Sequence, residues 1–146
     1  MNAIKVRNVE IGAGRPKIIV PIVEKTIEAI AAQGRKLTGE NLDVVEWRVD
    51  FFDDVFDTAK VLMAAKGLRE ALGDIPILFT FRTKKEGGEK AITMAAYTQL
   101  NKAVAESGLV DLVDVEIFSG DAIVAENITN IHRAGAKVVG SNHDFF

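Results

Sequence analysis

Apolar residues along the chain recur at two spacings, which predict strands and helices in alternation. Residues 4–11 (IKVRNVEI) alternate apolar and polar side chains, as a strand with one solvated face does. The following GAGRP predicts a turn, and with it a two-stranded ribbon. Residues 17–23 (KIIVPIV) are nearly all apolar and predict a buried strand, whereas residues 25–37 carry apolar side chains at helical spacing and predict a helix.

The same strand and helix unit then recurs along the rest of the chain. The predicted strands are residues 42–49, 75–81, 109–117 and 136–141, and the predicted helices between them are residues 57–72, 92–106 and 122–134, the first with Asp57 as its N-cap. Strands that are nearly continuous apolar runs, each followed by a helix, are typical of parallel strands buried on both faces. The predicted fold class is therefore α/β.

Composition limits the classes of protein that are possible. A chain of 146 residues, 48% of them hydrophobic, can bury one sizeable core, so we expect a single domain over residues 1–146. The formal charge of -3 comes from interspersed charges and argues against a nucleic-acid-binding protein. There is no cysteine, residues 1–12 lack the apolar region typical of a signal peptide, and no apolar run is long enough to span a membrane. We therefore expect a cytoplasmic protein without a nucleic-acid or membrane partner.

Polar residues gather at the ends of successive predicted strands. They are Glu46 and Arg48, Arg82 and Glu86, Asp114 and Glu116, and Asn142, His143 and Asp144. A lone charge at a strand end is usually a solvated loop residue. Several successive strand ends with polar groups instead predict a site, because loops at the C-terminal ends of parallel strands converge on ligands.

The chemistry of this set predicts a small anionic substrate that undergoes acid/base catalysis. Two guanidinium groups suit a carboxylate or vicinal hydroxyls, and carboxylates can orient them. The imidazole of His143 can move protons near neutral pH, whereas His132 fits an ordinary surface residue. Residues 86–90 (EGGEK) lack the spacing of a phosphate loop, so we interpret them as a flexible turn. We expect neither a metal nor a cofactor.

Five segments resemble one enzyme family. EWRVD (46–50), FTFRTKKEGGE (79–89), GLVDLVDVEIF (108–118) and VVGSNHDF (138–145), with GRPKIIVPI (14–22), closely resemble the type I 3-dehydroquinate dehydratases of the shikimate pathway. These lyases convert 3-dehydroquinate to 3-dehydroshikimate. The resemblance implies an eight-stranded (β/α) barrel with an N-terminal β-ribbon covering its bottom. This chain would hold about five parallel strands and four helices of that TIM-type barrel.

The resemblance also implies roles for individual residues. Glu46, Arg48 and Arg82 match substrate-contacting positions, Glu86 matches the carboxylate that supports the histidine, and His143 matches the general acid/base. Pro21 stands where some members have a substrate-contacting serine. The family uses a lysine on the sixth strand that forms a Schiff base with the substrate ketone. That lysine has no counterpart in this sequence, so we expect a truncated half-barrel that is inactive or only trace-active alone.

Several alternatives stay open at this stage. The chain is a natural short family member or a fragment of a longer enzyme. It is a dehydratase completed by a partner or another copy, or a non-catalytic module that binds small hydroxy-acids. Lys84 and Lys85 are weak substitutes for the missing amine, because an exposed ammonium is a poor nucleophile. Unpaired strand edges predict a homodimer, and we expect Phe79 and Val115 to face the barrel interior.

Overall fold

The N-terminal ribbon is a β-hairpin. The structure is a computed structural model that describes residues 2–145. Strands β1 (Ile4–Val6) and β2 (Val9–Ile11) pair antiparallel, with Val6 opposite Val9. The hairpin turn therefore lies at residues 7–8, where Arg7 adopts a positive φ of 50°, inside the segment predicted as a single strand, while GAGRP forms a separate turn after the hairpin. Arg7 and Asn8 are two consecutive polar residues, so they break the alternation of apolar and polar side chains at the turn, and this break is the signal that the prediction of one strand overlooked.

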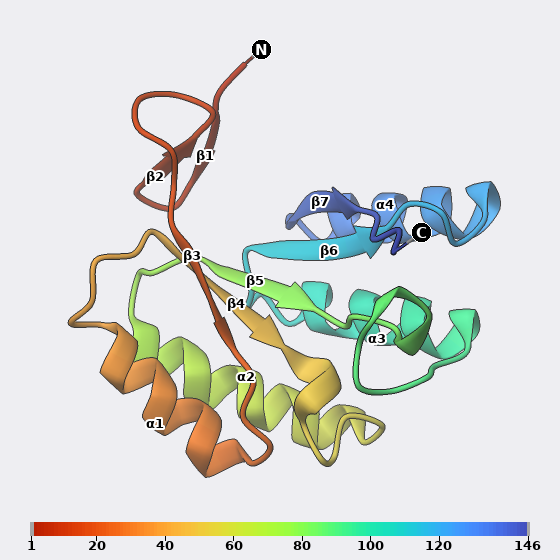
Figure 1. The fold of residues 1–146 in the computed structure, drawn as a ribbon, viewed down its shortest axis with the longest axis horizontal. Helices are drawn as coiled ribbons and strands as arrows, with labels where there is room; N and C mark the ends of the chain where they lie inside the picture. The colour runs from red at the N-terminus through yellow and green to blue at the C-terminus, as the bar shows by residue number, and fades with distance from the viewer. Residues whose placement is uncertain (1, 146) are drawn as a thin grey trace.

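The main sheet has five parallel strands, which confirms the predicted α/β class. They are β3 (Ile19–Ile22), β4 (Val44–Arg48), β5 (Ile77–Thr80), β6 (Leu112–Glu116) and β7 (Lys137–Ser141), and their order in the sheet is their order along the chain (Figure 1). Each β/α connection thus advances by one strand, as in a barrel. Strands β3 and β7 form the two edges of the described sheet.

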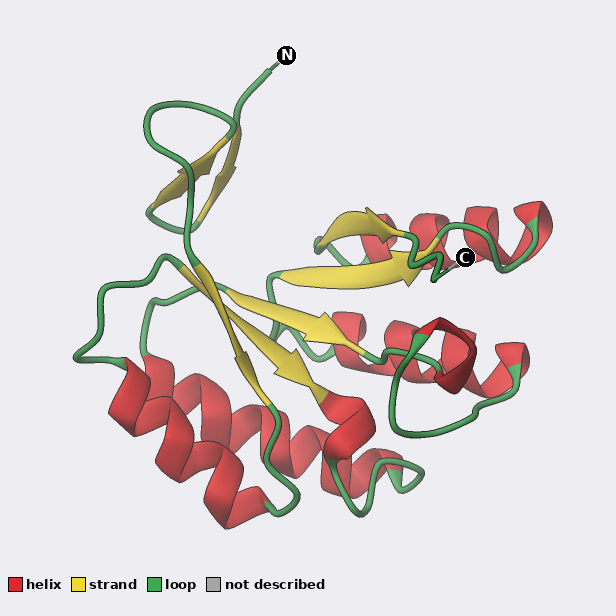
Figure 2. Ribbon diagram, in the orientation of Figure 1, coloured by secondary structure: helices red, strands yellow, loops and turns green. Residues whose placement is uncertain are grey.

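Four helices follow the first four strands of this sheet. They are α1 (Ile27–Leu37), α2 (Thr58–Leu72), α3 (Met94–Glu106) and α4 (Asp121–Arg133), with short 3-10 helices η1 (Val49–Phe51) and η2 (Lys84–Glu86) after β4 and β5. They line one side of the curved sheet (Figure 2). Asp57 is the N-cap of α2, as predicted, and accepts a hydrogen bond from the backbone N of Lys60. No helix within residues 2–145 is long and apolar enough to cross a membrane.

Alternate residues of each strand point to opposite faces of the sheet. One set, which includes Trp47, Phe79 and Val115, packs against the helices in the main core, and all three are fully buried. The expectation that Phe79 and Val115 face the barrel interior is therefore wrong. The apolar character of both residues was correct, but their strand register sends them towards the helices.

The opposite, inner face changes from apolar to polar along the strands. Val44, Leu78 and Leu112 near the strand starts form a small cluster with Val6 of the hairpin, which covers this end of the sheet. Two and four residues further along the same strands, the inner face carries polar groups instead. Because residues two apart share a face, this change places these inner polar residues of β4, β5 and β6 towards the C-terminal ends of their strands.

Candidate active site

Arg82, which follows β5, lies in a buried carboxylate pocket. Its Nη1 donates to Asp114 Oδ1 at 3.1 Å, to Glu116 Oε2 at 2.9 Å and to Ser141 Oγ at 3.0 Å. Burial acts to lower the pKa of the Arg82 guanidinium, but the charges and hydrogen bonds of Asp114 and Glu116 outweigh it and the pKa is raised. Arg82 is therefore a fixed cation. Its recorded side-chain bonds all use Nη1, so they leave the donors on Nη2 and Nε for a ligand.

A tyrosine from α3 makes this arrangement possible. Pairing between β5 and β6 stops at Phe79 and Val113, so β6 continues towards Glu116 without a neighbouring strand on that side. The hydroxyl of Tyr97 fills the gap: it donates to the backbone O of Asp114 at 3.3 Å and accepts from the backbone N of Glu116 at 3.1 Å. Because the Tyr97 hydroxyl satisfies these backbone groups of β6, β5 can stop pairing with β6 at this point. The residues that follow β5 can then direct Arg82 towards β6.

Arg48, at the end of β4, is held by the buried carboxylate of Asp50. Nε and Nη2 of Arg48 donate to Oδ1 and Oδ2 of Asp50, both at 2.8 Å. The hydrogen bond to Asp50 raises the pKa of Arg48. The guanidinium also lies 5.0 Å from the ring centre of Phe51. Arg48 is thus oriented before any ligand binds.

Glu46 lies two residues before Arg48 on the same face of β4, which places a hydrogen-bond acceptor beside the guanidinium. Its Oε2 accepts from the hydroxyl of Thr80 at 2.8 Å.

His143 follows β7 and is fixed by Glu86. One oxygen of Glu86, Oε1, accepts from the backbone N of His143 at 2.9 Å and lies 3.1 Å from its Nδ1. Because a carboxylate only accepts, Nδ1 carries the proton in this contact and Nε2 is left as the basic nitrogen. Phe145, near the C-terminus, also packs on the loop that follows β5, since a Cβ at Gly87 would lie 2.8 Å from its ring.

Four of the five predicted site residues lie at or beyond the C-terminal ends of β4, β5 and β7, Glu46 lies in the middle of β4, and the predicted Asp114 and Glu116 hold Arg82. The structure adds Asp50, Tyr97 and Ser141. Asp50 continues the same-face spacing of Glu46 and Arg48 and could have been found from it. His132 is exposed, as predicted.

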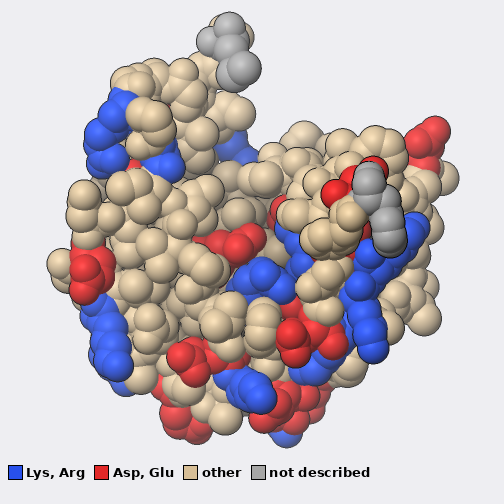
Figure 3. Space-filling model, in the orientation of Figure 1, with Lys and Arg blue, Asp and Glu red and all other residues tan. Residues whose placement is uncertain are grey.

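The charge balance of the cluster is negative. Two guanidinium groups lie among five carboxylates, which are Glu46, Asp50, Glu86, Asp114 and Glu116. Figure 3 shows acidic and basic side chains next to one another in the middle of the visible face. A cluster of this composition has its cations already compensated. It therefore favours neutral hydrogen-bonding groups of a ligand over an additional carboxylate.

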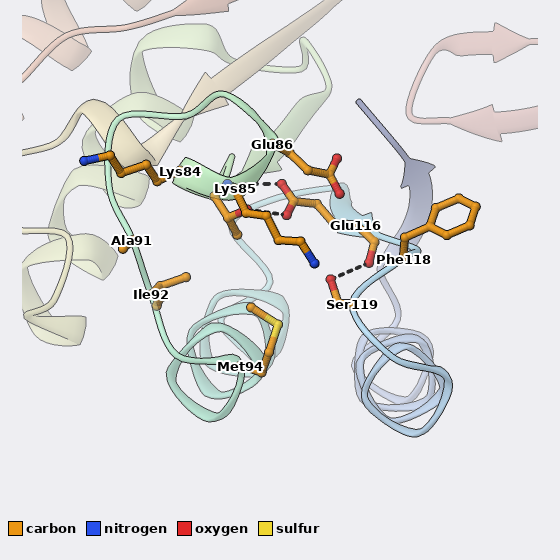
Figure 4. A pocket seen from close by; sticks show the side chains of 10 residues that line it. Lys84, Lys85, Glu86, Ala91, Ile92, Met94, Glu116, Phe118 and Ser119 are labelled. Atoms are coloured by element: carbon orange, nitrogen blue, oxygen red, sulfur yellow. Dashed lines mark hydrogen bonds between the residues drawn. The ribbon is translucent and has the colours of Figure 1, made fainter. Parts of the chain in front are cut away.

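Two hollows lie beside this cluster. One, of about 500 Å³, is lined by Glu86, His143 and Phe145 together with Lys85, Phe118, Asn142 and Asp144. A smaller one, of about 190 Å³, lies between η2, the start of α3 and the segment after β6 (Figure 4). In that view Lys84 points away from Glu116, while Lys85 extends towards Ser119. Glu86 lines both hollows, so its contact with His143 borders open space.

A family model described as type I 3-dehydroquinase matches residues 18–146. A 3-dehydroquinate dehydratase of Listeria monocytogenes (serotype 4a, strain HCC23) is 52% identical over 145 residues, which are 99% of this chain and 58% of the relative. The corresponding enzyme of Clostridioides difficile (strain 630) is 47% identical over 142 residues, 97% of this chain and 56% of the relative. The chain thus spans little more than half the length of these curated relatives.

Solved structures agree with these sequence matches. A type I 3-dehydroquinate dehydratase from Clostridium difficile, solved with covalently modified comenic acid, superposes with a TM-score of 0.96 at 46% identity, covering 98% of this chain and 56% of that one. The 3-dehydroquinate dehydratase from Enterococcus faecalis gives 0.93 at 41% identity, covering 97% and 59%. The five strands and four helices therefore match part of a dehydroquinase barrel.

Proposed function

The chain belongs to the type I 3-dehydroquinase family, and from this premise we propose that its strand-end cluster binds 3-dehydroquinate or a closely similar hydroxy-acid. In the same proposal, His143 supplies the general acid/base for the loss of water that gives 3-dehydroshikimate. The observation that carries the proposal is the contact of Glu86 Oε1 with both the backbone N and the Nδ1 of His143, at 2.9 and 3.1 Å. A carboxylate that fixes the imidazole in one tautomer is what proton transfer at Nε2 requires.

The proton balance of this reaction needs one residue that acts twice. Nε2 of His143 accepts a proton from the carbon next to the substrate carbonyl and returns it to the departing hydroxyl, so that water leaves and the histidine is regenerated. The negative charge of Glu86 stabilises the imidazolium between the two steps. Glu86 is 8% exposed, and this burial strengthens its effect on the ring.

Arg48, Arg82 and Glu46 are assigned to the hydroxyl groups of the substrate. Both guanidinium groups already have carboxylate partners, so their remaining N–H groups act as directed donors more than as free charges. Glu46 adds an acceptor beside them. Vicinal hydroxyls, which donate and accept, complement this combination. The carboxylate of the substrate then needs a cation outside the cluster.

The electron sink of the family reaction also has to come from elsewhere. Lys84 and Lys85 line hollows that Glu86 also lines, and both are exposed on η2. Lys90 is engaged with the backbone O of Phe52. In the proposal, residues 1–146 bind the ligand, and imine formation depends on an amine that these residues do not supply. A non-catalytic hydroxy-acid-binding module is the second candidate, favoured by a cluster that is fully organised without such an amine.

Binding of 3-dehydroquinate to the chain tests this proposal. Calorimetry with wild type should show weak binding, and Glu46→Gln should weaken it about tenfold through loss of one charged acceptor. Glu40→Gln, at an exposed position before β4, is the matched control and should bind as wild type does. Ligand should shift the ring signals of His143 and leave those of the exposed His132 unchanged. Equal binding by wild type and Glu46→Gln, or no binding at millimolar ligand, would overturn the assignment.

A further inference from the structure

We propose that Asp50 is a positioning residue that couples the substrate-binding guanidinium of Arg48 to the acid/base pair of Glu86 and His143. This inference rests on the proposed function of these groups. Asp50 is 0% exposed and lies in η1, directly after β4. Its carboxylate touches neither the hollows nor His143, so it acts through the residues that it holds.

Four donors surround the Asp50 carboxylate, two on each oxygen. Oδ1 accepts from Arg48 Nε at 2.8 Å and from the backbone N of Arg82 at 3.3 Å. Oδ2 accepts from Arg48 Nη2 at 2.8 Å and from the backbone N of Glu89 at 3.1 Å. Each oxygen thus joins the guanidinium to one backbone point of the chain after β5. A buried carboxylate with four donors is fully satisfied and sets the relative positions of all its partners.

The two backbone contacts hold both ends of one loop. Arg82 and Glu89 flank residues 83–88, which contain η2 and carry Glu86. The loop is closed further by the hydrogen bond from the backbone N of Lys84 to the O of Lys90 at 2.9 Å. Gly88 packs so closely that a Cβ there would lie 1.8 Å from the backbone O of Arg82. The interpretation of residues 86–90 as a flexible turn therefore missed an anchored loop.

The position of Glu86 then determines that of His143. Glu86 Oε1 is the recorded hydrogen-bond partner of both the backbone N and the ring of His143. A shift of the loop by a few tenths of an ångström would lengthen both contacts and release the tautomer of the imidazole. Asp50 thus controls the distance between the group that binds the substrate and the group that moves the proton.

Asp50→Asn is the substitution that separates this role from simple packing. The amide has the shape of the carboxylate but presents a donor in place of one acceptor oxygen. In either orientation, one side of the amide meets two N–H groups and loses both hydrogen bonds. Asp53→Asn is the matched control, because Asp53 lies three residues away on the surface.

The nitrogen-15 spectrum of the histidine rings is the deciding measurement. In wild type above neutral pH, His143 should show the Nδ1–H tautomer, with His132 as the internal reference in the same molecule. Asp50→Asn should give His143 a mixture of tautomers, as should Glu86→Gln, and should weaken 3-dehydroquinate binding about tenfold. Asp53→Asn should leave both unchanged. A wild-type ring spectrum for His143 in a folded Asp50→Asn protein would overturn the proposal.

A second measurement needs no variant and serves if Asp50→Asn fails to fold. Glu89 is exposed, yet its backbone N–H donates to the buried Asp50, so it should exchange with solvent at least a hundredfold more slowly than in an unfolded peptide. Exchange at the unfolded rate would refute the anchor. Calorimetry of ligand binding tests the proposed function separately, which fails if wild type binds no 3-dehydroquinate. In that case, the ring spectrum of His143 and the exchange rate of the Glu89 amide still decide whether Asp50 positions the loop.

Discussion

Replacing Tyr97 by Phe removes one oxygen from the open edge of β6, and its cost can be worked out from the structure. The hydroxyl is the recorded partner of two buried backbone groups, the N–H of Glu116 at 3.1 Å and the C=O of Asp114 at 3.3 Å. A buried polar group without a partner costs about 1–3 kcal/mol, and the longer bond to Asp114 counts for less. We therefore expect a loss of about 2–3 kcal/mol in the free energy of unfolding.

Urea unfolding followed by far-ultraviolet circular dichroism measures this loss. With an m-value of about 2 kcal/mol/M for a chain of this size, the midpoint should fall by roughly 1–1.5 M. Hydrogen exchange at the Glu116 amide should accelerate more than exchange at β4 amides, because the defect lies at β6. A loss below about 0.5 kcal/mol, with Glu116 protected as before, would refute the role of the phenol as the substitute for a strand.

The same residue predicts a pH effect. Burial raises the pKa of Tyr97, the only tyrosine, to about 12. The tyrosine of the unfolded chain ionises from about pH 10, so the free energy of unfolding should fall as the pH rises from about 10 to about 12. A tyrosinate absorbance midpoint near pH 10 in the folded chain would contradict this. Arg82→Ala leaves Asp114 and Glu116 buried without their cation and should cost about 3–5 kcal/mol in urea unfolding, whereas Lys102→Ala removes an exposed pair with Glu106 and should cost about 0.5 kcal/mol or less. Purified residues 1–146 should show at most trace dehydratase activity and no borohydride-trapped mass adduct with 3-dehydroquinate; turnover of roughly 1 per second or faster would disprove this.

Most of the fold was predictable because each element has a strong local signal. The apolar runs and helical spacings located five parallel strands and four helices, and Asp57 marked the start of α2. The errors have two sources. Arg7 and Asn8, two consecutive polar residues, break the alternation at the hairpin turn, and this local signal was overlooked. The face occupied by Phe79 instead depends on strand register.

The candidate site was predictable only in part, for a similar reason. Same-face spacing grouped Glu46 with Arg48, and the positions of Arg82 and His143 after strands placed them at one end of the sheet. The contacts that fix these groups join residues far apart in the chain: Tyr97 reaches β6 from α3, and Asp50 reaches Glu89 across 39 positions. Such pairs leave no periodic signal in a single sequence.

The charges of the inner face and the apolar residues of the β3 edge favour one arrangement of the predicted homodimer over another. Packing two copies with their inner faces together would bring two clusters with excess carboxylates against each other, which the repulsion of like charges opposes. The β3 edge offers a better surface. It has no neighbouring strand on one side in the described sheet, and it exposes Ile18, Ile19 and Val23 by 41%, 51% and 45%.

Association through β3 predicts a specific pair of results. Light scattering after size exclusion should give a dimer of the 15.9 kDa chain at micromolar concentration, and Ile19→Asp should convert it to monomer. Met63→Asp is the matched control, because Met63 is 60% exposed on α2, away from the β3 edge, and should leave the dimer intact. A wild-type monomer would rule out the association. A dimer that survives Ile19→Asp would place the contact elsewhere, since a charge on an edge strand is an effective block to strand pairing.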